Sequence, residues 1–135
     1  MSAMSEPTQA NGAPRILVID DGITMRLFYR TVLEAAGFEV AEATNGVEGN
    51  EKVLAHRFDL LIVDINMPKM DGYSMLRAIR RDAAVQGVPA VTISTEAGEA
   101  DVAQAFEAGA NFYLVKPVAP ETLTEVARLM TGGAA

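Results

Sequence analysis

The chain has 135 residues, half of them hydrophobic, which is enough for one domain with a sizeable core. It contains no cysteine, and this excludes disulfide bonds and thiolate metal sites. Its formal net charge of −7 disfavours direct nucleic-acid binding, because such binding draws most of its affinity from contacts between basic residues and phosphates.

The first residues, MSAMSEPTQANGAP, have the Ser, Pro, Gln and Asn bias of a disordered segment. They lack the basic and apolar regions of a signal peptide. No stretch approaches the roughly 18 uninterrupted apolar residues of a membrane span. We therefore expect a tail over 1–14, one domain over 15–131 and a short tail over 132–135, in a cytoplasmic protein that does not contact a membrane.

Short apolar runs with β-branched residues alternate along the chain with longer stretches of helical spacing. The predicted strands are RILVI, FEVAEA, DLLIV, PAVTIS and NFYLV, at 15–19, 38–43, 59–63, 89–94 and 111–115. The first and third are nearly continuous apolar runs, as strands covered on both faces are. The second alternates apolar and polar residues, which indicates a strand at the edge of the sheet.

The predicted helices lie at 23–36, 46–55, 71–82, 97–108 and 120–131. Apolar residues recur on one face of the first and of the last three, at i, i+3 or i+4. Gly37 is a natural stop for the first helix, and Asp71 can cap the third. The second helix carries Gly49 in its interior, where a glycine costs about 1 kcal/mol relative to alanine.

Alternating strands and helices predict parallel βαβ units with right-handed crossovers. The predicted fold class is α/β, a doubly wound five-stranded parallel sheet. Ligands of such sheets collect at the carboxyl ends of the strands. Candidate functional side chains follow or end four of the predicted strands: Asp20, Asp21, Asp64, Ser94, Thr95 and Lys116.

Three carboxylates brought to one place at neutral pH need a compensating cation. Oxygen ligands favour a hard ion, and an open site that retains water suits Mg²⁺. Lys116 supplies a second positive charge, which can hold an anion. A metal, a carboxylate, a hydroxyl and a lysine together suit phosphoryl transfer, and an aspartate can accept a phosphoryl group as an acyl phosphate. We therefore predict that Asp64 is a phosphoryl acceptor.

Four motifs in this order resemble those of the receiver domains of two-component response regulators. They are DD at 20–21, DINMPKMDG at 64–72, Ser94 at the end of the fourth strand and KP at 116–117. The resemblance is greatest to the single-domain chemotaxis type, and it covers about 15–131. It implies a flavodoxin-like fold with strand order 2-1-3-4-5.

The resemblance also implies a role for each matching residue of the acidic site. Asp64 would be the phosphoacceptor, and Lys116 would contact the phosphoryl oxygens, followed by a cis peptide bond to proline. The Mg²⁺ ligands would be Asp21, Asp64 and the backbone carbonyl of Asn66, with Asp20 acting through water.

Other matching residues correspond to the switch of these proteins and to positions that tune the lifetime of the phosphoryl group. Ser94 would hydrogen-bond the phosphoryl group, and the rotamer of Tyr113 would follow that hydroxyl. Thr95 stands where a small residue is usual, which leaves open which of the two hydroxyls is the switch. Asn66 and Glu96 would tune phosphoryl lifetime.

The implied partners are a histidine kinase or phosphohistidine relay protein, and a downstream target such as a flagellar motor protein. The signal would leave by protein contact through the helix at 97–108, the strand at 111–115 and the helix at 120–131. We expect a monomer that assists only its own phosphorylation and dephosphorylation and is otherwise no enzyme. His56, the only histidine, is expected to be exposed at the end of the second helix.

Three alternatives remain at this point. The same fold can serve as a phosphorelay shuttle or a phosphate sink in another pathway, such as a stress response. An aspartate-nucleophile phosphatase usually has a second acid two residues after the nucleophile, where this chain has Asn66. A flavin or nucleotide binder has a similar topology, but no glycine-rich phosphate loop follows the first strand.

Overall fold

The computed structural model describes residues 12–65 and 71–132. Their strands form one parallel sheet of five, in the order β2-β1-β3-β4-β5. The strands are β1 (Arg15–Ile19), β2 (Glu39–Ala43), β3 (Leu60–Asp64), β4 (Ala90–Ser94) and β5 (Phe112–Val115). The predicted doubly wound fold, its strand order and the edge position of the second strand are confirmed. The proposed tails, 1–14 and 132–135, lie largely outside the described residues and stay a prediction.

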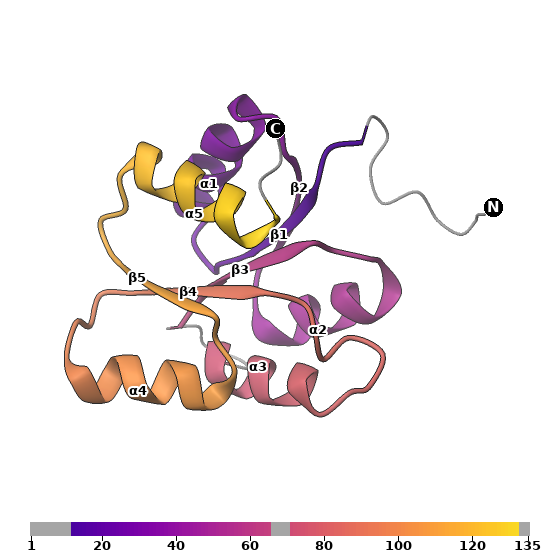
Figure 1. Cartoon of the computed structure of the whole chain (residues 1–135), viewed down its shortest axis with the longest axis vertical. Coiled ribbons are helices and arrows are strands. Elements are labelled where there is room, and N and C mark those ends of the chain that lie inside the picture. Colours follow the sequence, from indigo (N-terminus) through magenta and orange to yellow (C-terminus); the bar gives the residue numbers. More distant parts are fainter. Residues whose placement is uncertain (1–11, 66–70, 133–135) are drawn as a thin grey trace.

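The five predicted helices are also present, with ends within two residues of those expected. They are α1 (Ile23–Ala35), α2 (Gly46–Ala55), α3 (Gly72–Arg80), α4 (Glu99–Ala108) and α5 (Pro120–Met130). α1 and α5 cover one face of the sheet, and α2, α3 and α4 cover the other (Figure 1). In the described part of the chain, no helix is both long and apolar enough to cross a membrane.

Alternate residues of the central strands supply two separate cores, as the period of two in a strand requires. Ile16 and Ile62 pack with the helices α1 and α5, whereas Leu17 and Leu61 pack with the helices on the other face. All four are buried. The strands therefore form a rigid layer whose carboxyl ends hold the loops that follow them in fixed positions.

α2 forms over its whole predicted range in spite of the glycine in its interior. A Cβ atom at Gly49 would lie 2.9 Å from Met75 Sδ and 3.1 Å from Ile19 Cγ1. The glycine therefore allows α2 to pack closely against α3 and β1, and this packing offsets its low helix propensity. Asn45 also stabilises the start of the helix, because its side chain accepts a hydrogen bond from Glu48 N–H.

The predicted helix ends are confirmed where the sequence marks them. Asp71 caps α3 by accepting a hydrogen bond from Ser74 N–H at 2.8 Å. Gly37 follows α1 with a φ of 99°, a conformation that favours glycine. His56 follows α2 and is exposed, as expected.

Candidate functional site

Parallel pairing of β1 and β3 brings two carboxylates together. Ile19 pairs in register with Val63, so Asp20 and Asp64, the next residues, lie side by side at the carboxyl end of the sheet. Asp20 N–H extends the pairing of β1 with β2 by one residue, because it donates a hydrogen bond to Ala43 O at 3.1 Å. The position of each carboxylate therefore follows from strand register.

The predicted acidic cluster is present. The carboxylate groups of Asp20, Asp21 and Asp64 each offer an oxygen within 4.8 Å of the others. Asp20 and Asp64 are only 2% and 4% exposed, whereas Asp21 is exposed to solvent. Asp20 Oδ1 accepts a hydrogen bond from Gly22 N–H at 2.8 Å, and its buried Oδ2 atom has no hydrogen-bond partner within the described protein.

The electrostatics of this cluster favour a bound cation. Burial raises the pKa of Asp20, and the negative charge of Asp64 raises it further, against the opposing effects of the Gly22 hydrogen bond and the Lys116 charge. A hard divalent ion with its bound water would supply both the missing partner of Asp20 Oδ2 and the missing positive charge. Oxygen ligands with one solvent-exposed side suit Mg²⁺, which retains several waters. The residues present therefore fit this ion.

Lys116 supplies an amine to the same cluster from the end of β5. Its backbone N–H donates to Ser94 O at 2.8 Å, which continues the pairing of β4 and β5 past the last strand residue. Its Nζ atom lies 3.5 Å from Asp64 Oδ1. The Lys116–Pro117 peptide bond is cis, as the resemblance implied.

The hydroxyl groups of Ser94 and Thr95 lie at the carboxyl end of β4, the strand next to β3, and they differ in their surroundings. Ser94 is the last residue of β4 and is 2% exposed, and its Oγ atom accepts a hydrogen bond from Glu96 N–H at 3.0 Å. Thr95 is exposed, and its hydroxyl lies 3.4 Å from a carboxylate oxygen of Glu96. Of the two hydroxyls, Ser94 is thus the one built into the end of the sheet.

Tyr113 of β5 is connected to the loop that carries these hydroxyls. Its half-buried ring packs against the core on the α3 and α4 side, and its hydroxyl donates to Glu96 O at 2.6 Å. The loop between β4 and α4 is therefore tied to β5 by one hydrogen bond from an aromatic side chain.

Residues 16–128 match the response regulator receiver domain. The chain belongs to the response regulator receiver family. The match includes all of the acidic cluster, the lysine and the strand-end serine. Receiver domains of this family bind Mg²⁺ at an acidic pocket, and the chemotaxis members act as signalling proteins.

Among its relatives, the receiver is 40% identical to the chemotaxis protein CheY1 of Helicobacter pylori over 120 residues, which cover 87% of this chain and 97% of CheY1. Among solved structures, chemotaxis protein CheY4 of Vibrio cholerae has a TM-score of 0.84 at 33% identity, covering 88% of this chain and 99% of CheY4. The receiver domain of the Pseudomonas aeruginosa sensor histidine kinase PA1611, which holds a magnesium ion in its active site cleft, has a TM-score of 0.83 at 26% identity, covering 90% and 99% of the two chains.

Gly72, which the sequence marked only as the last residue of the DINMPKMDG motif, also shapes this receiver's site. A Cβ atom at Gly72 would lie 2.7 Å from Asp64 O, 3.0 Å from Val63 Cγ1 and 3.1 Å from Ile65 Cα. Its N–H also donates to Ile65 O at 3.3 Å. The glycine thus allows the start of α3 to lie directly behind the end of β3. The motif match marked the position, but only the packing shows why it is glycine.

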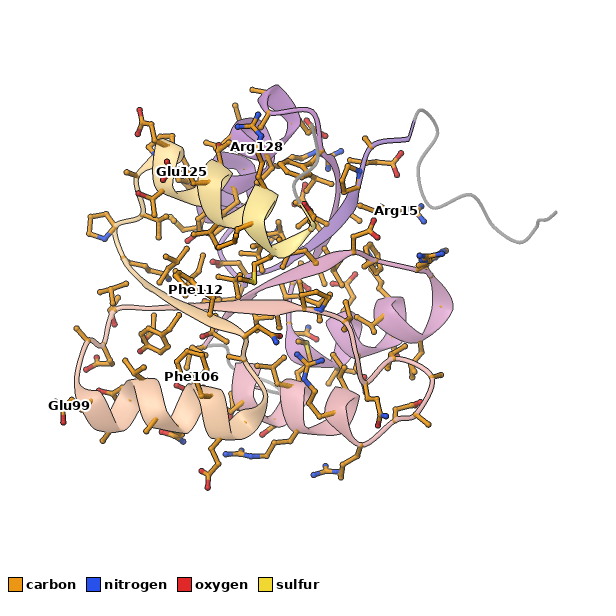
Figure 2. The ribbon with its side chains drawn as sticks, in the orientation of Figure 1. Arg15, Glu99, Phe106, Phe112, Glu125 and Arg128 are labelled. Atoms are coloured by element: carbon orange, nitrogen blue, oxygen red, sulfur yellow. The ribbon has the colours of Figure 1, made fainter. Side chains whose placement is uncertain are left out.

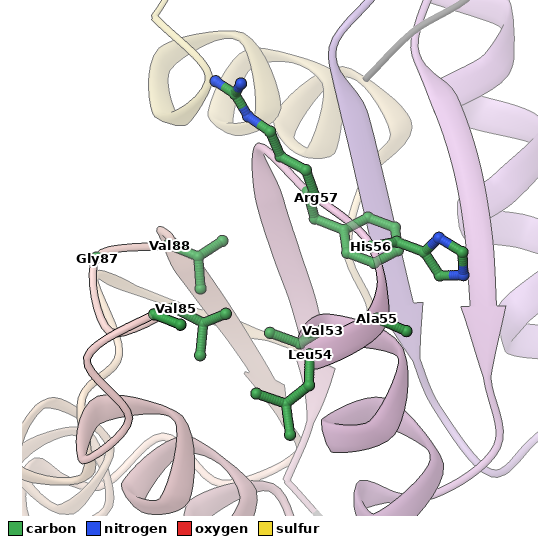
Figure 3. A pocket seen from close by; sticks show the side chains of 10 residues that line it. Val53, Leu54, Ala55, His56, Arg57, Val85, Gly87 and Val88 are labelled. Atoms are coloured by element: carbon green, nitrogen blue, oxygen red, sulfur yellow. The ribbon is translucent and has the colours of Figure 1, made fainter. Parts of the chain in front are cut away.

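A groove of about 500 Å³ lies at the opposite, amino end of the receiver's sheet. Val53 and Leu54 of α2 line one side, and Val85 and Val88 of the loop before β4 line the other (Figure 3). The groove contains none of the predicted site residues and no carboxylate, so it does not fit phosphoryl chemistry. Of the predicted residues, Asn66 lies outside the described part of the chain.

Proposed function

We propose that this receiver is a single-domain response regulator of the chemotaxis type, with Asp64 as its phosphoryl acceptor. The supporting observation is the convergence of three carboxylates within 4.8 Å, with the Lys116 amine 3.5 Å from Asp64 Oδ1. The name and identity of the H. pylori relative favour chemotaxis over other pathways. The same chemistry as a phosphorelay shuttle or phosphate sink is the alternative.

The transfer reaction uses the Asp64 carboxylate as a nucleophile. One carboxylate oxygen attacks the phosphorus of a phosphohistidine on the donor protein, so that a P–O bond forms as the P–N bond breaks and the imidazole leaves. Lys116, already beside Asp64 Oδ1, would then contact the phosphoryl oxygens. Water later hydrolyses the acyl phosphate and returns the free carboxylate.

We propose Asp21, Asp64 and the backbone carbonyl of Asn66 as direct ligands of Mg²⁺, with Asp20 acting through a bound water. When bound, the ion would neutralise charge on the transferring phosphoryl group. The buried and unpartnered Oδ2 atom of Asp20 supports this assignment, because a buried carboxylate oxygen without a donor is costly unless a ligand completes it.

The switch would begin at Ser94, whose burial at the end of β4 supports it over the exposed Thr95. Recruitment of the Ser94 hydroxyl by the phosphoryl group would compete with its present bond from Glu96 N–H. Tyr113 holds the carbonyl of the same glutamate, so a shift of that loop would release or reorient its ring. Glu96 and Asn66 would in addition set the lifetime of the phosphoryl group.

The output surface would be the face formed by α4, β5 and α5. Phe106 projects from α4 toward β5 (Figure 2), and its side chain and that of Val115 are 47% and 40% exposed. Exposed apolar residues on this face suit a protein partner. The partners would be a histidine kinase or phosphohistidine relay protein upstream and a motor or other target protein downstream, all in the cytoplasm.

The assignment of Asp64 is tested by labelling with a small-molecule phosphodonor, such as acetyl phosphate, in the presence of Mg²⁺. Asp64→Asn should abolish labelling, whereas Asp82→Asn, an acidic residue beyond the far end of α3, should label as the wild type does. Persistent labelling of the Asp64 variant would show that another group accepts the phosphoryl group.

A second experiment separates an effector from a shuttle or a sink. Phosphodonor treatment should increase co-precipitation of a flagellar motor or other target protein if the receiver is an effector. A shuttle would instead pass its label to a histidine-containing relay protein, and a sink would lose it to water without either partner.

A further inference from the structure

An arginine of α1 holds the main chain at the acidic site. Arg26 Nη1 donates to the backbone carbonyl of Asp20 at 2.7 Å. Asp20 N–H is bonded to Ala43 O, and Asp20 Oδ1 is bonded to Gly22 N–H. Three polar groups of Asp20 are therefore fixed by the protein, and only Oδ2 is left for a ligand.

Arg26 is in turn held by an acidic residue of β2. Its Nε atom lies 2.9 Å from Glu42 Oε1, and its side chain is only 11% exposed. Glu42 Oε2 accepts a hydrogen bond from Arg30 at 2.7 Å, and the Glu42 carbonyl accepts one from Lys52 of α2. Bonds from Arg30, and then from Arg26, lower the pKa of Glu42, so it remains charged. Glu42 thereby joins α1, β2 and α2.

We propose that Arg26, held by Glu42, is a positioning residue for the metal site of this receiver. It acts through the Asp20 main chain and holds the Asp20 carboxylate in place before the cation binds. Sites that are held in their bound geometry bind more tightly, because binding then costs less ordering. The inference rests on the proposed function, since it takes the acidic cluster as the Mg²⁺ site.

The charge of Arg26 and its positioning role act in opposite directions on cation binding. A positive charge near the site repels Mg²⁺, so its removal would tighten binding if charge were all that mattered. Loss of the hydrogen bond to Asp20 would weaken binding. Arg30 provides a matched control, because it lies on the same helix and bonds the same glutamate, whereas its hydrogen bonds go to Glu34 and Glu42 and not to Asp20.

The experiment measures the Mg²⁺ dissociation constant of the full chain by titration calorimetry. Arg26→Gln should raise it about tenfold, the lower end of the effect of residues that orient metal ligands. Arg30→Gln removes the same charge and should leave it unchanged or slightly lower. If Arg26→Gln binds Mg²⁺ as Arg30→Gln does, or more tightly than the wild type, the positioning role is wrong.

Two further variants keep the test decisive if Arg26→Gln folds poorly, which urea unfolding in EDTA would reveal. Arg26→Lys keeps the charge but can reach only one of the two partners, so we expect about a threefold weaker affinity. Glu42→Gln alone should weaken Mg²⁺ binding. The double variant should bind Mg²⁺ about as weakly as Arg26→Gln alone, because Glu42 affects the site only through Arg26. Full wild-type affinity in Arg26→Lys, or additive effects of the pair, would overturn the inference.

Failure of this inference is distinguishable from failure of the proposed function. If the wild type does not bind Mg²⁺, or if Asp64→Asn is still labelled, the proposed function is wrong. If the wild type binds Mg²⁺ and Asp64→Asn is unlabelled, equal affinities of the Arg26 and Arg30 variants overturn only the role of Arg26.

Discussion

The two arginines at the amino end of the sheet are paired with groups of the protein itself, whereas the acidic cluster at the carboxyl end holds three carboxylates beside one lysine amine. The amino end carries Arg15, whose guanidinium lies near Glu39 and the ring of Phe58, and Arg80, whose guanidinium donates to four acceptor atoms. The carboxyl end carries Asp20, Asp21 and Asp64 within 4.8 Å of one another, with the Lys116 amine beside them.

Arg80 shows how complete the pairing at the amino end is. The side chain makes five hydrogen bonds, to Gly109 O twice, to Gln86 O, to Val88 O and to Asn111 Oδ1. They connect the end of α3 to the loops before β4 and β5. Burial lowers the pKa of this arginine. A guanidinium with its donors satisfied by carbonyls serves the fold and leaves little for a ligand.

Arg15 is paired at the same end by different means. Its backbone N–H donates to Asp59 Oδ2 at 2.8 Å, and its guanidinium lies 3.1 Å from Glu39 Oε1 and 5.7 Å from the ring centre of Phe58. Figure 2 shows it at the start of β1, across the sheet from α5. The contrast indicates that the arginines at one end of the sheet stabilise the fold, whereas the clustered carboxylates at the other end cost stability and could hold a cation.

The largest expected effect is at the amino end. Arg80→Ala should lower the free energy of unfolding by about 3 kcal/mol, because it leaves several partly buried carbonyls without donors. Mg²⁺ affinity should stay within about twofold of the wild type, since the site is at the other end of the sheet. Urea unfolding and calorimetry measure the two quantities, and Arg81→Ala, at an exposed neighbour, is the control. A loss below about 1 kcal/mol would show that the five bonds contribute little.

An intermediate effect on stability is expected from a glycine at the carboxyl end of the sheet, with a glycine at the amino end as its control. Gly72→Ala should destabilise the protein by about 2 kcal/mol, because its Cβ atom would lie 2.7 Å from Asp64 O and overpack the end of β3. Gly87→Ala, in the loop at the amino end, meets nothing within 4 Å and should change stability by less than about 0.5 kcal/mol.

Mg²⁺-dependent labelling of Asp64 should fall in Gly72→Ala and remain normal in Gly87→Ala. Equal stabilities of the two alanine variants would mean that the contact behind Asp64 relaxes without cost.

The smallest expected effect has the opposite sign. Asp20→Asn should raise the free energy of unfolding in EDTA by about 1 kcal/mol, because it removes the buried charge of a carboxylate whose Oδ2 atom lacks a hydrogen-bond partner. The same variant should lose most of the stabilisation that Mg²⁺ gives the wild type. If Asp20→Asn were less stable than the wild type in EDTA, the buried Asp20 carboxylate would not be destabilising, and the prediction would be wrong.

The pH dependence of stability sharpens this last prediction. Burial raises the pKa of Asp20 in the folded protein above the ordinary value of 3.8. The folded protein therefore holds a proton that the unfolded chain has already lost, so the contribution of Asp20 to stability in EDTA falls as the pH rises from 3.8 through the folded-state pKa and then levels off. Urea unfolding across this range should show that the stability of the wild type relative to Asp20→Asn falls as the pH rises, because the opposite contributions of Glu42 and Glu48, whose pKa values hydrogen bonds lower, are common to both proteins.

The elements, the doubly wound fold and the identity of the clustered residues could all be predicted from the sequence. The strands and helices are local patterns of period 2 and 3.6, and parallel strands bring their carboxyl ends to one end of the sheet. Asp20, Asp64 and Lys116 could therefore be predicted to meet, and the motif order predicted which family they belong to. The cap at Asp71 and the stop at Gly37 are local for the same reason.

The features that depend on distances between separate segments became known only from the folded structure. Gly49 was interpreted as a weakness of α2 and proved to be the place where that helix approaches Met75 and Ile19. Arg26 and Arg80 are ordinary helix residues in the sequence, and their partners lie on other elements. Hydrogen bonds and steric contacts act over a few ångströms, so a residue's partners become known only when the fold has brought them together.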